Sequence, residues 1–261
     1  MAINFFHGDC MEYMKDKPDG YYDLAIVDPP YGGGGMSSAT GKTDSAGCLT
    51  GMELPPPEKK TNHLLGGRRA RYGVLPPPTQ KVARTGGTWA GKYNPQGGVF
   101  DDASAGIQFW DYAPPQEYFD ELFRVSKNQI IWGGNYFNLP PCRCFLIWRK
   151  GGVSETFSMA MAEYAWTSFN ANAKVFEAIP QGTPKNPRFH PTQKPVKLYK
   201  WCIGLFAKKG WRLLDTHGGS MSSAVAAYEM GLDMDICEIN DFYFQKGKER
   251  VEKAQRQQFL F

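Results

Sequence analysis

Two kinds of hydrophobic pattern alternate along the chain. Short runs such as Leu24–Val27 and Gln129–Trp132 are apolar almost throughout and end at polar or glycine positions, as strands buried on both faces do. After Pro115 the apolar positions instead recur every three or four residues, which is the spacing of a helix. The pattern predicts strands at residues 4–7, 24–27, 129–132, 144–148, 163–166, 212–215 and 234–237. It predicts helices at residues 115–126, 195–207 and 221–230 and from residue 242 onward.

Residues 32–98 interrupt this alternation. They contain fifteen glycines and seven prolines and have neither a strand period nor a helix period. An irregular stretch of that length within a compact domain is usually functional, so we expect an inserted functional segment here. A shorter turn-rich stretch, residues 170–189, is expected to be a linker.

The C-terminal third has a different organisation. A strand, a paired-glycine turn, a helix and a strand ending in an acidic residue follow one another. That order is typical of a βαβ unit of the Rossmann type. The sequence therefore predicts a single α/β domain over residues 1–261, with residues 32–98 inserted in it. Its sheet is expected to be mixed and mostly parallel, with helices on both faces.

The composition is that of a globular protein, with 42% hydrophobic and 21% charged residues. No apolar run approaches the roughly 18 residues of a membrane span, and no basic-then-apolar leader begins the sequence. We therefore expect a cytoplasmic protein without membrane contact. The six cysteines and four histidines show no zinc-ligand spacing, so no metal is expected.

The net charge of +4 is unevenly distributed. Residues 32–98 contain nine Lys or Arg and three Asp or Glu, a balance of +6. The remainder contains 21 basic and 23 acidic residues, a balance of −2. A basic segment on a near-neutral body suits a polyanionic partner, although a solvated loop would have the same composition.

The first candidate for chemistry is Asp28-Pro29-Pro30-Tyr31, which directly follows an apolar run. An exocyclic amine on a nucleobase is a poor nucleophile because its lone pair is delocalised into the ring. Asp28 and the carbonyl group of Pro29 could accept its two N–H hydrogens and direct the lone pair toward a methyl donor. Pro30 restricts the backbone, and Tyr31 offers a ring for stacking on a flipped base. The alternative is a turn that only ends a strand.

The second candidate is the turn at residues 215–220, whose paired glycines would let a ligand approach the backbone closely. Glu238 ends the next predicted strand, at the position where an acidic residue binds ribose hydroxyls in Rossmann units. Together they favour a cofactor that contains a nucleoside. The full three-glycine fingerprint of a dinucleotide site is missing.

The order of the motifs resembles that of the amino-methylating DNA methyltransferases of the permuted beta group. Residues 28–31 resemble their catalytic motif, and residues 215–220 resemble their cofactor glycine motif. Residues 190–195 (His-Pro-Thr-Gln-Lys-Pro) match a signature that precedes the glycine motif, and residues 7–10 (His-Gly-Asp-Cys) are similar to the opening segment. Residues similar to the intermediate blocks are 129–137, 145–150 and 162–166.

This resemblance implies S-adenosyl-L-methionine as the cofactor and adenine in double-stranded DNA as the methyl acceptor. Asp28 would contact both the methionine amine and the target nitrogen. The residues implied in cofactor binding are Asp9, Cys10, Asp28, Thr192, Lys194, Asp215, His217, Gly219, Ser220, Glu238, Ile239 and Asn240. Several small enzymes of this kind are encoded by phages, and others belong to restriction-modification systems. A phage-encoded chain would act in the host cytoplasm.

Two positions depart from the family's glycine motif. His217 replaces the usual aromatic residue, and Met221 replaces a second glycine, where it would crowd the cofactor. The family's recognition region commonly precedes the segment at residues 190–195, but little sequence is available there. Residues 32–98 are the better candidate for binding DNA. Their densest positive charge is formed by Arg68, Arg69 and Arg71.

Three other functions remain open at the level of sequence. A cytosine-N4 methyltransferase needs the same geometry, but its motif usually begins with serine instead of Asp28. A DNA-binding or decoy protein without methylation activity would tolerate the altered glycine motif. A Rossmann oxidoreductase would leave residues 28–31 and 190–195 unexplained.

Overall fold

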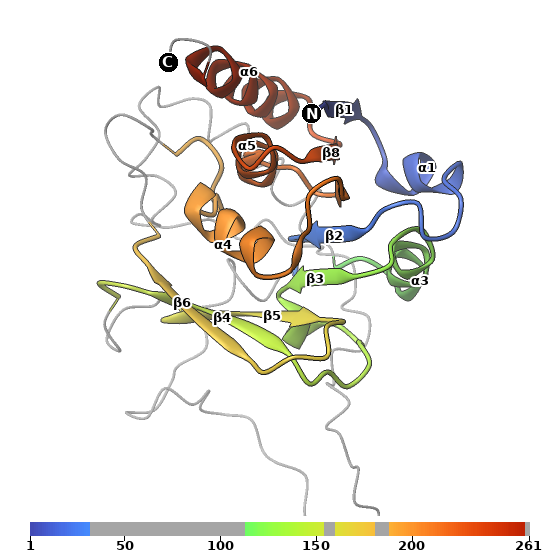
Figure 1. Ribbon diagram of the computed structural model, residues 1–261, viewed down its shortest axis with the longest axis vertical. Helices are drawn as coiled ribbons and strands as arrows, with labels where there is room; N and C mark the ends of the chain where they lie inside the picture. Colours follow the sequence, from blue (N-terminus) through green and yellow to red (C-terminus); the bar gives the residue numbers. More distant parts are fainter. Residues whose placement is uncertain (32–112, 154–159, 181–187, 259–261) are drawn as a thin grey trace, which may run out of the picture.

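A computed structural model describes residues 1–31, 113–153, 160–180 and 188–258 of the chain. Its strands form one eight-stranded sheet in the order β1-β8-β7-β2-β3-β5-β4-β6 (Figure 1). The strands are β1 (Ile3–His7), β2 (Leu24–Val27), β3 (Gln129–Trp132), β4 (Phe145–Lys150), β5 (Ala162–Thr167), β6 (Lys174–Ala178), β7 (Arg212–Asp215) and β8 (Asp233–Glu238). Neighbouring strands in this sheet are parallel, except that β5 runs antiparallel to both β3 and β4. The predicted mixed, mostly parallel sheet is thereby confirmed.

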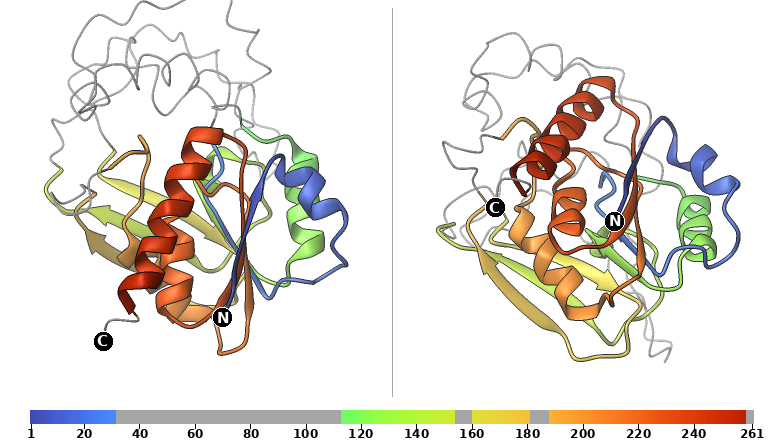
Figure 2. Two further views of the ribbon diagram at one scale, coloured as in Figure 1. Left: turned by 90° about the horizontal axis from the view of Figure 1, so that it is seen from above. Right: turned by 45° about the horizontal axis from the view of Figure 1, so that its top comes forward.

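Helices cover both faces of the sheet (Figure 2). On one face lie α1 (Cys10–Lys15) and α3 (Gln116–Val125), and on the other lie α4 (Val196–Phe206), α5 (Ser222–Glu229) and α6 (Asp241–Gln258). The alternation of side chains along β2 shows how the sheet separates two cores. Leu24 and Ile26 pack in the core beneath α4, α5 and α6, whereas Ala25 and Val27 pack in the core beneath α1 and α3. All four residues are fully buried, as the continuous apolar run predicts.

The chain reverses its winding direction between β7 and β2, which lie side by side. From β7 the chain passes through α5 to β8 on one side, whereas β2 is followed by α3 and β3 on the other side. The two crossovers diverge at this point, so a crevice is expected outside the carboxyl ends of β7 and β2. In open α/β sheets, ligands bind in such a crevice.

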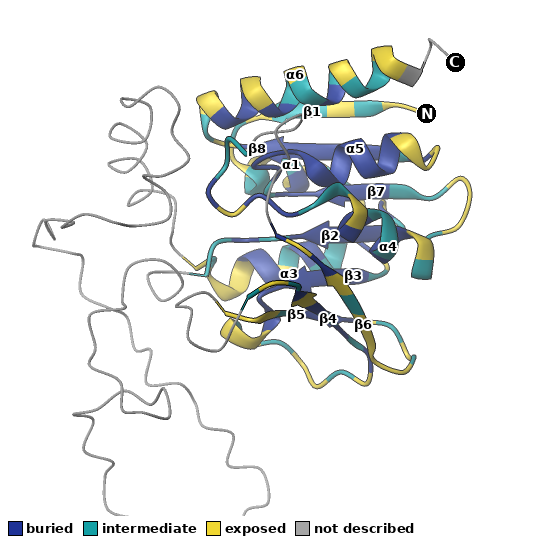
Figure 3. Ribbon diagram, turned by 90° about the vertical axis from the view of Figure 1, so that its left-hand side faces the viewer, coloured by how far each residue is buried: buried dark blue, intermediate teal, exposed yellow. Residues whose placement is uncertain are grey.

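Three local predictions were incomplete. The first predicted strand, residues 4–7, is β1 at the edge of the sheet, and it is only half-buried rather than buried (Figure 3). The predicted linker over residues 170–189 contains the edge strand β6, which pairs with β4 in parallel. Helix α1 and a single 3-10 turn at Gly134–Tyr136 were not predicted. The inserted segment at residues 32–98, with Arg68, Arg69 and Arg71, lies outside the described residues.

Within the described part of the chain, no helix combines the length and the apolar character needed to cross a bilayer.

Candidate active site

Three carboxylates lie at the carboxyl ends of three adjacent strands. Asp28 directly follows β2, Asp215 ends β7, and Glu238 ends β8. Burial is the main reason that the pKa of Asp215 is raised to about 7, and the charges of Asp28 and Glu238 contribute to this rise. The sequence-predicted catalytic segment and the sequence-predicted glycine turn therefore meet at one site, although nearly the whole chain separates them.

Asp28 is held by two donors. The Tyr31 hydroxyl donates a hydrogen bond to Oδ1 at 2.8 Å, and the Lys194 ammonium group forms an ion pair with Oδ2. Burial raises the pKa of Asp28. The positive charge of Lys194 opposes this rise but does not cancel it. The side chain of Asp28 retains 14% exposure.

The ring of Tyr31 fits against the segment that follows β3. Gly133 has φ +69°, and a Cβ atom there would lie 2.0 Å from the Tyr31 ring. The ring of Tyr31 stacks on the ring of Tyr136, with ring centroids 4.8 Å apart and an interplanar angle of 20°. Tyr136 itself is 54% exposed. Gly133 thus makes room for the ring of Tyr31, whose hydroxyl is bonded to Asp28.

Lys194, just before α4, contacts a second carboxylate that the sequence analysis did not identify. Its ammonium lies 3.1 Å from Oε2 of Glu163 in β5, and Oε1 of Glu163 is 2.7 Å from the ammonium of Lys150 in β4. Lys150 and Glu163 lie in two of the segments that resemble family blocks. The signal that could have identified them is a charged residue among apolar neighbours in a predicted strand. We call Lys150, Glu163, Lys194 and Asp28 the buried charge chain.

The glycine turn is tied to the end of β8. The amide of Gly219 donates to Oε2 of Glu238 at 2.6 Å, and the amide of Asn240 donates to Oε1 at 2.8 Å. A Cβ atom at Gly218 would lie 2.9 Å from Ile236, so this glycine is also required for close packing of the turn on β8. Each carboxylate oxygen of Glu238 keeps lone pairs that could accept hydrogen bonds from ribose hydroxyls.

The two departures from the family's glycine motif have local explanations. Met221 has φ +54° and is fully buried, and its side chain lies against Gly247 of α6. His217 packs edge-on against Tyr118, with ring centroids 5.2 Å apart. Burial lowers the pKa of His217 to about 4, so the imidazole is neutral near pH 7.

The other predicted cofactor residues surround the same turn. Asp9 is exposed and caps α1 by accepting a hydrogen bond from the Met11 amide, while the half-buried Cys10 thiol has its pKa raised by burial and then by Asp9. Thr192 is exposed and lies beside His190, whose ring would contact a Cβ atom at Gly219. Further residues around the turn are Ser220, which is buried, Ile239, which is 61% exposed, and Asn240, whose side chain accepts from the Tyr243 amide.

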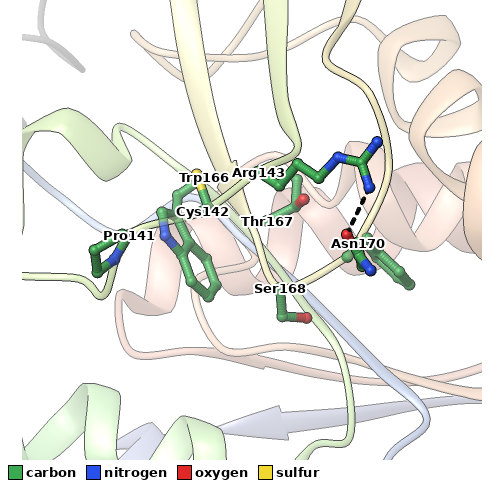
Figure 4. A pocket seen from close by; sticks show the side chains of 8 residues that line it. Pro141, Cys142, Arg143, Trp166, Thr167, Ser168 and Asn170 are labelled. Atoms are coloured by element: carbon green, nitrogen blue, oxygen red, sulfur yellow. Dashed lines mark hydrogen bonds between the residues drawn. The ribbon is translucent and has the colours of Figure 1, made fainter.

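A shallow pocket of about 280 Å³ lies elsewhere (Figure 4). It is lined by residues 141–143 before β4 and by residues 166–170 at and after the end of β5, and Arg143 donates to Asn170 there. β5 is antiparallel, and Thr167 pairs with Ile130 near the start of β3. The pocket therefore lies at the sheet edge opposite to the three carboxylates.

No cluster of three or more His, Cys, Asp or Glu side chains that could hold a metal ion occurs in the ranges that the structure describes.

The fold and the placement of this site define the class of protein. The sheet winds in both directions from β7 and β2, and the site lies at that switch point, as in Rossmann-like α/β proteins. Residues 81–249 match the N6/N4 methyltransferase family model, which is described as a DNA methylase. Because the match covers more than half of the sequence, the chain belongs to this family of DNA methyltransferases.

One solved structure supports the fold, and a second is reported for comparison. The PvuII DNA methyltransferase, described as cytosine-N4-specific, has a TM-score of 0.51 and 11% identity over 98% of this chain and 91% of that chain. The complex of M1.HpyAVI with SAM has a TM-score of 0.49 and 14% identity over 96% of this chain and 99% of that chain. At these identities the likeness concerns the Rossmann-like methyltransferase fold alone. No curated protein sequence matches the chain.

Proposed function

We propose that this chain transfers a methyl group from S-adenosylmethionine to the exocyclic amino group of adenine in a specific sequence of double-stranded DNA. The observation that supports this most directly is the position of Asp28-Pro29-Pro30-Tyr31 at the carboxyl end of β2, beside the glycine turn of β7. The aspartate at position 28, instead of a serine, favours adenine over cytosine. The motif order also supports membership of the permuted beta group.

The residues at the switch point suit S-adenosylmethionine as the cofactor. This molecule carries a positively charged sulfonium and amine, a ribose and an adenine, and its sulfonium supplies the methyl group. Asp28 and Asp215 offer negative charge to the two cationic groups, and Glu238 offers acceptors to the ribose. Ile239, an apolar side chain that is 61% exposed directly after Glu238, offers a surface for the adenine ring. The M1.HpyAVI structure is a complex with SAM.

The target amine would be oriented by Asp28. Its carboxylate accepts one N–H hydrogen, the carbonyl group of Pro29 accepts the other, and the nitrogen lone pair then points toward the methyl group. Tyr31 and Tyr136 provide aromatic surface for the flipped base. The carboxylate also offsets the positive charge that develops on the amine as it becomes methylated. The Tyr31 hydroxyl, which now donates to Asp28, shares that carboxylate with the incoming base.

The test is incorporation of tritium from labelled S-adenosylmethionine into unmethylated genomic DNA, followed by nucleoside analysis. N6-methyladenine is expected, and N4-methylcytosine would establish instead the specificity described for the PvuII enzyme. Asp28→Asn should lower the rate by at least about a hundredfold, because the amide can accept at only one of its two positions. Glu177→Gln, on the exposed ion pair with Arg149, is the matched control. Binding of DNA without any incorporation would favour a decoy protein.

The contact with DNA is proposed for residues 32–98, with Arg68, Arg69 and Arg71 as its strongest positive charge.

A further inference from the structure

The buried charge chain joins Asp28 of the site to charged residues of three other segments. Its charges alternate in sign, from Lys150 through Glu163 and Lys194 to Asp28, and the contacts link β4, β5, the segment before α4 and the end of β2. The Lys150 and Lys194 side chains are only 8% and 3% exposed. Only Asp28 and Lys194 were expected to act in methyl transfer, so the other half of this chain has no assigned role.

Burial of such charges is costly. Two ion pairs taken out of water lose hydration that their mutual attraction only partly restores, and apolar residues of similar volume are often equally stable or more stable. Packing alone therefore does not account for Lys150 and Glu163. Their contacts instead restrict one side chain, because Glu163 is the second anion that holds the Lys194 ammonium.

Lys194 is fixed at both ends. Its backbone carbonyl accepts a hydrogen bond from the Ser222 hydroxyl at 2.7 Å, at the start of α5. Its ammonium is held between Asp28 and Glu163. Without Glu163, the long lysine side chain would have one anionic partner instead of two, and its ion pair with Asp28 would no longer be held in a single geometry.

We propose that Glu163, which is itself held by its ion pair with Lys150, is a positioning residue for methyl transfer that holds the Lys194 ammonium against Asp28. This inference rests on the proposed function, because it concerns the carboxylate that orients the target amine. Glu163 acts through Lys194 and does not itself touch the base.

The electrostatic surroundings of Lys194 give this role a distinct signature. Burial acts to lower the pKa of Lys194, but Asp28 and Glu163 together raise it above its usual value. Burial raises the pKa of Asp28, and the charge of Glu163 raises it further. Loss of the negative charge at position 163 should therefore lower both pKa values. The titratable groups that face the Lys194 ammonium or its two carboxylate partners are Asp28 and Tyr31 after β2, Lys150 in β4, Glu163 in β5, His190 in the preceding segment, and Tyr199 and Cys202 in α4.

The experiment compares Glu163→Gln with the wild-type protein and with Glu177→Gln, an exposed control in the neighbouring strand β6. The turnover number and the KM values for S-adenosylmethionine and unmethylated genomic DNA are measured from pH 5 to pH 10. Glu163→Gln should reduce turnover by about tenfold to a hundredfold through misplacement of Asp28, with the KM value for DNA within about twofold and a rise in the KM value for S-adenosylmethionine that is smaller than the fall in turnover. The acid limb of its pH profile should move to lower pH, because loss of the charge at position 163 lowers the pKa of Asp28. Glu163→Asp should restore the wild-type acid limb and part of the turnover.

Two results would overturn the inference. One is a pH profile of Glu163→Gln whose acid limb coincides with the wild-type acid limb while the melting temperature falls, which would show a purely structural role. If Glu163→Gln does not fold, Lys150→Met carries the test, and unchanged turnover in that variant is the other contrary result. Failure of the proposed function is distinguishable, because the wild-type protein itself would then incorporate no methyl groups.

Discussion

At the scale of a single residue, Asp215 makes cofactor binding sensitive to pH. Its pKa is raised to about 7 because burial disfavours the charged carboxylate. A cationic cofactor should bind to the ionised Asp215 carboxylate. At low pH the protonated carboxyl group must therefore lose its proton when the cofactor binds. We expect the affinity for S-adenosylmethionine to fall by about tenfold for each pH unit below 7. Calorimetric titrations between pH 5.5 and pH 7.5 measure this slope.

The control for this prediction is Asp215→Asn, which should bind more weakly and with little dependence on pH. The free protein offers an independent check. Because the folded-state pKa is raised, protonation stabilises the fold at low pH, and this contribution is lost as the pH rises from about 4 to about 7. At most about 4 kcal/mol is involved, and Asp215→Asn should remove the effect. A pH-independent wild-type affinity would contradict the placement of the cofactor at this carboxylate.

The residues of the site were only partly predictable from the sequence. Asp28 and Lys194 stood in recognisable motifs, and the structure shows that they form an ion pair. Glu163 and Lys150 were missed because their role depends on the antiparallel insertion of β5 between β3 and β4. No spacing in the sequence shows that a strand will be inserted there. Tertiary contacts of that kind become visible only with the sheet order.

At the scale of elements, the pattern of apolar residues predicted the strand bounds most accurately in the centre of the sheet. The bounds of β2, β3 and β7 agree with the prediction because these strands are buried on both faces and read as continuous apolar runs. β6 was missed because most of its side chains are exposed at the sheet edge. Helix α1 was missed because six residues do not establish a helical period.

The contact between the glycine turn and α6 leads to a second prediction. A Cβ atom at Gly247 would lie 2.6 Å from Cγ of Met221 and 3.2 Å from the Gly219 carbonyl oxygen. Gly247→Ala should therefore lower the free energy of unfolding by about 1–3 kcal/mol, although alanine is the better helix former. It should also weaken S-adenosylmethionine binding, because the strain is transmitted to the turn. Urea unfolding and calorimetry measure the two effects.

Met221→Gly tests the same contact from the other side. Glycine removes the cost of the left-handed backbone at position 221, but it leaves a cavity in place of a fully buried side chain. In the double variant the alanine at position 247 occupies part of that cavity. The free energy of unfolding of the double variant should consequently exceed the value expected from adding the two single effects by about 1 kcal/mol or more. Strict additivity would show that the two side chains do not limit one another.

At the scale of the whole molecule, the two ends of the chain form the site together. Asp28 lies in the N-terminal part, whereas Lys194, Asp215 and Glu238 lie in the C-terminal part. The sheet order brings them together because β2 is the neighbour of β7. The inserted segment at residues 32–98 begins directly after Tyr31, which is part of the site. That segment also contains the positive charge excess of the chain.

That distribution of charge leads to the last prediction. Residues 32–98 have a balance of +6, and the rest of the chain has a balance of −2. Neutralisation of Arg68, Arg69 and Arg71 together should weaken binding to double-stranded DNA, and each lost phosphate contact should reduce the slope of log K against log salt by about one. Cofactor affinity should barely change, because the cofactor residues lie at the strand ends of the sheet. Lys197, Lys200 and Lys208 on or beside α4 provide a matched triple replacement for comparison. If the arginine variant kept the wild-type affinity and salt slope, residues 170–188 would become the candidate region for DNA recognition.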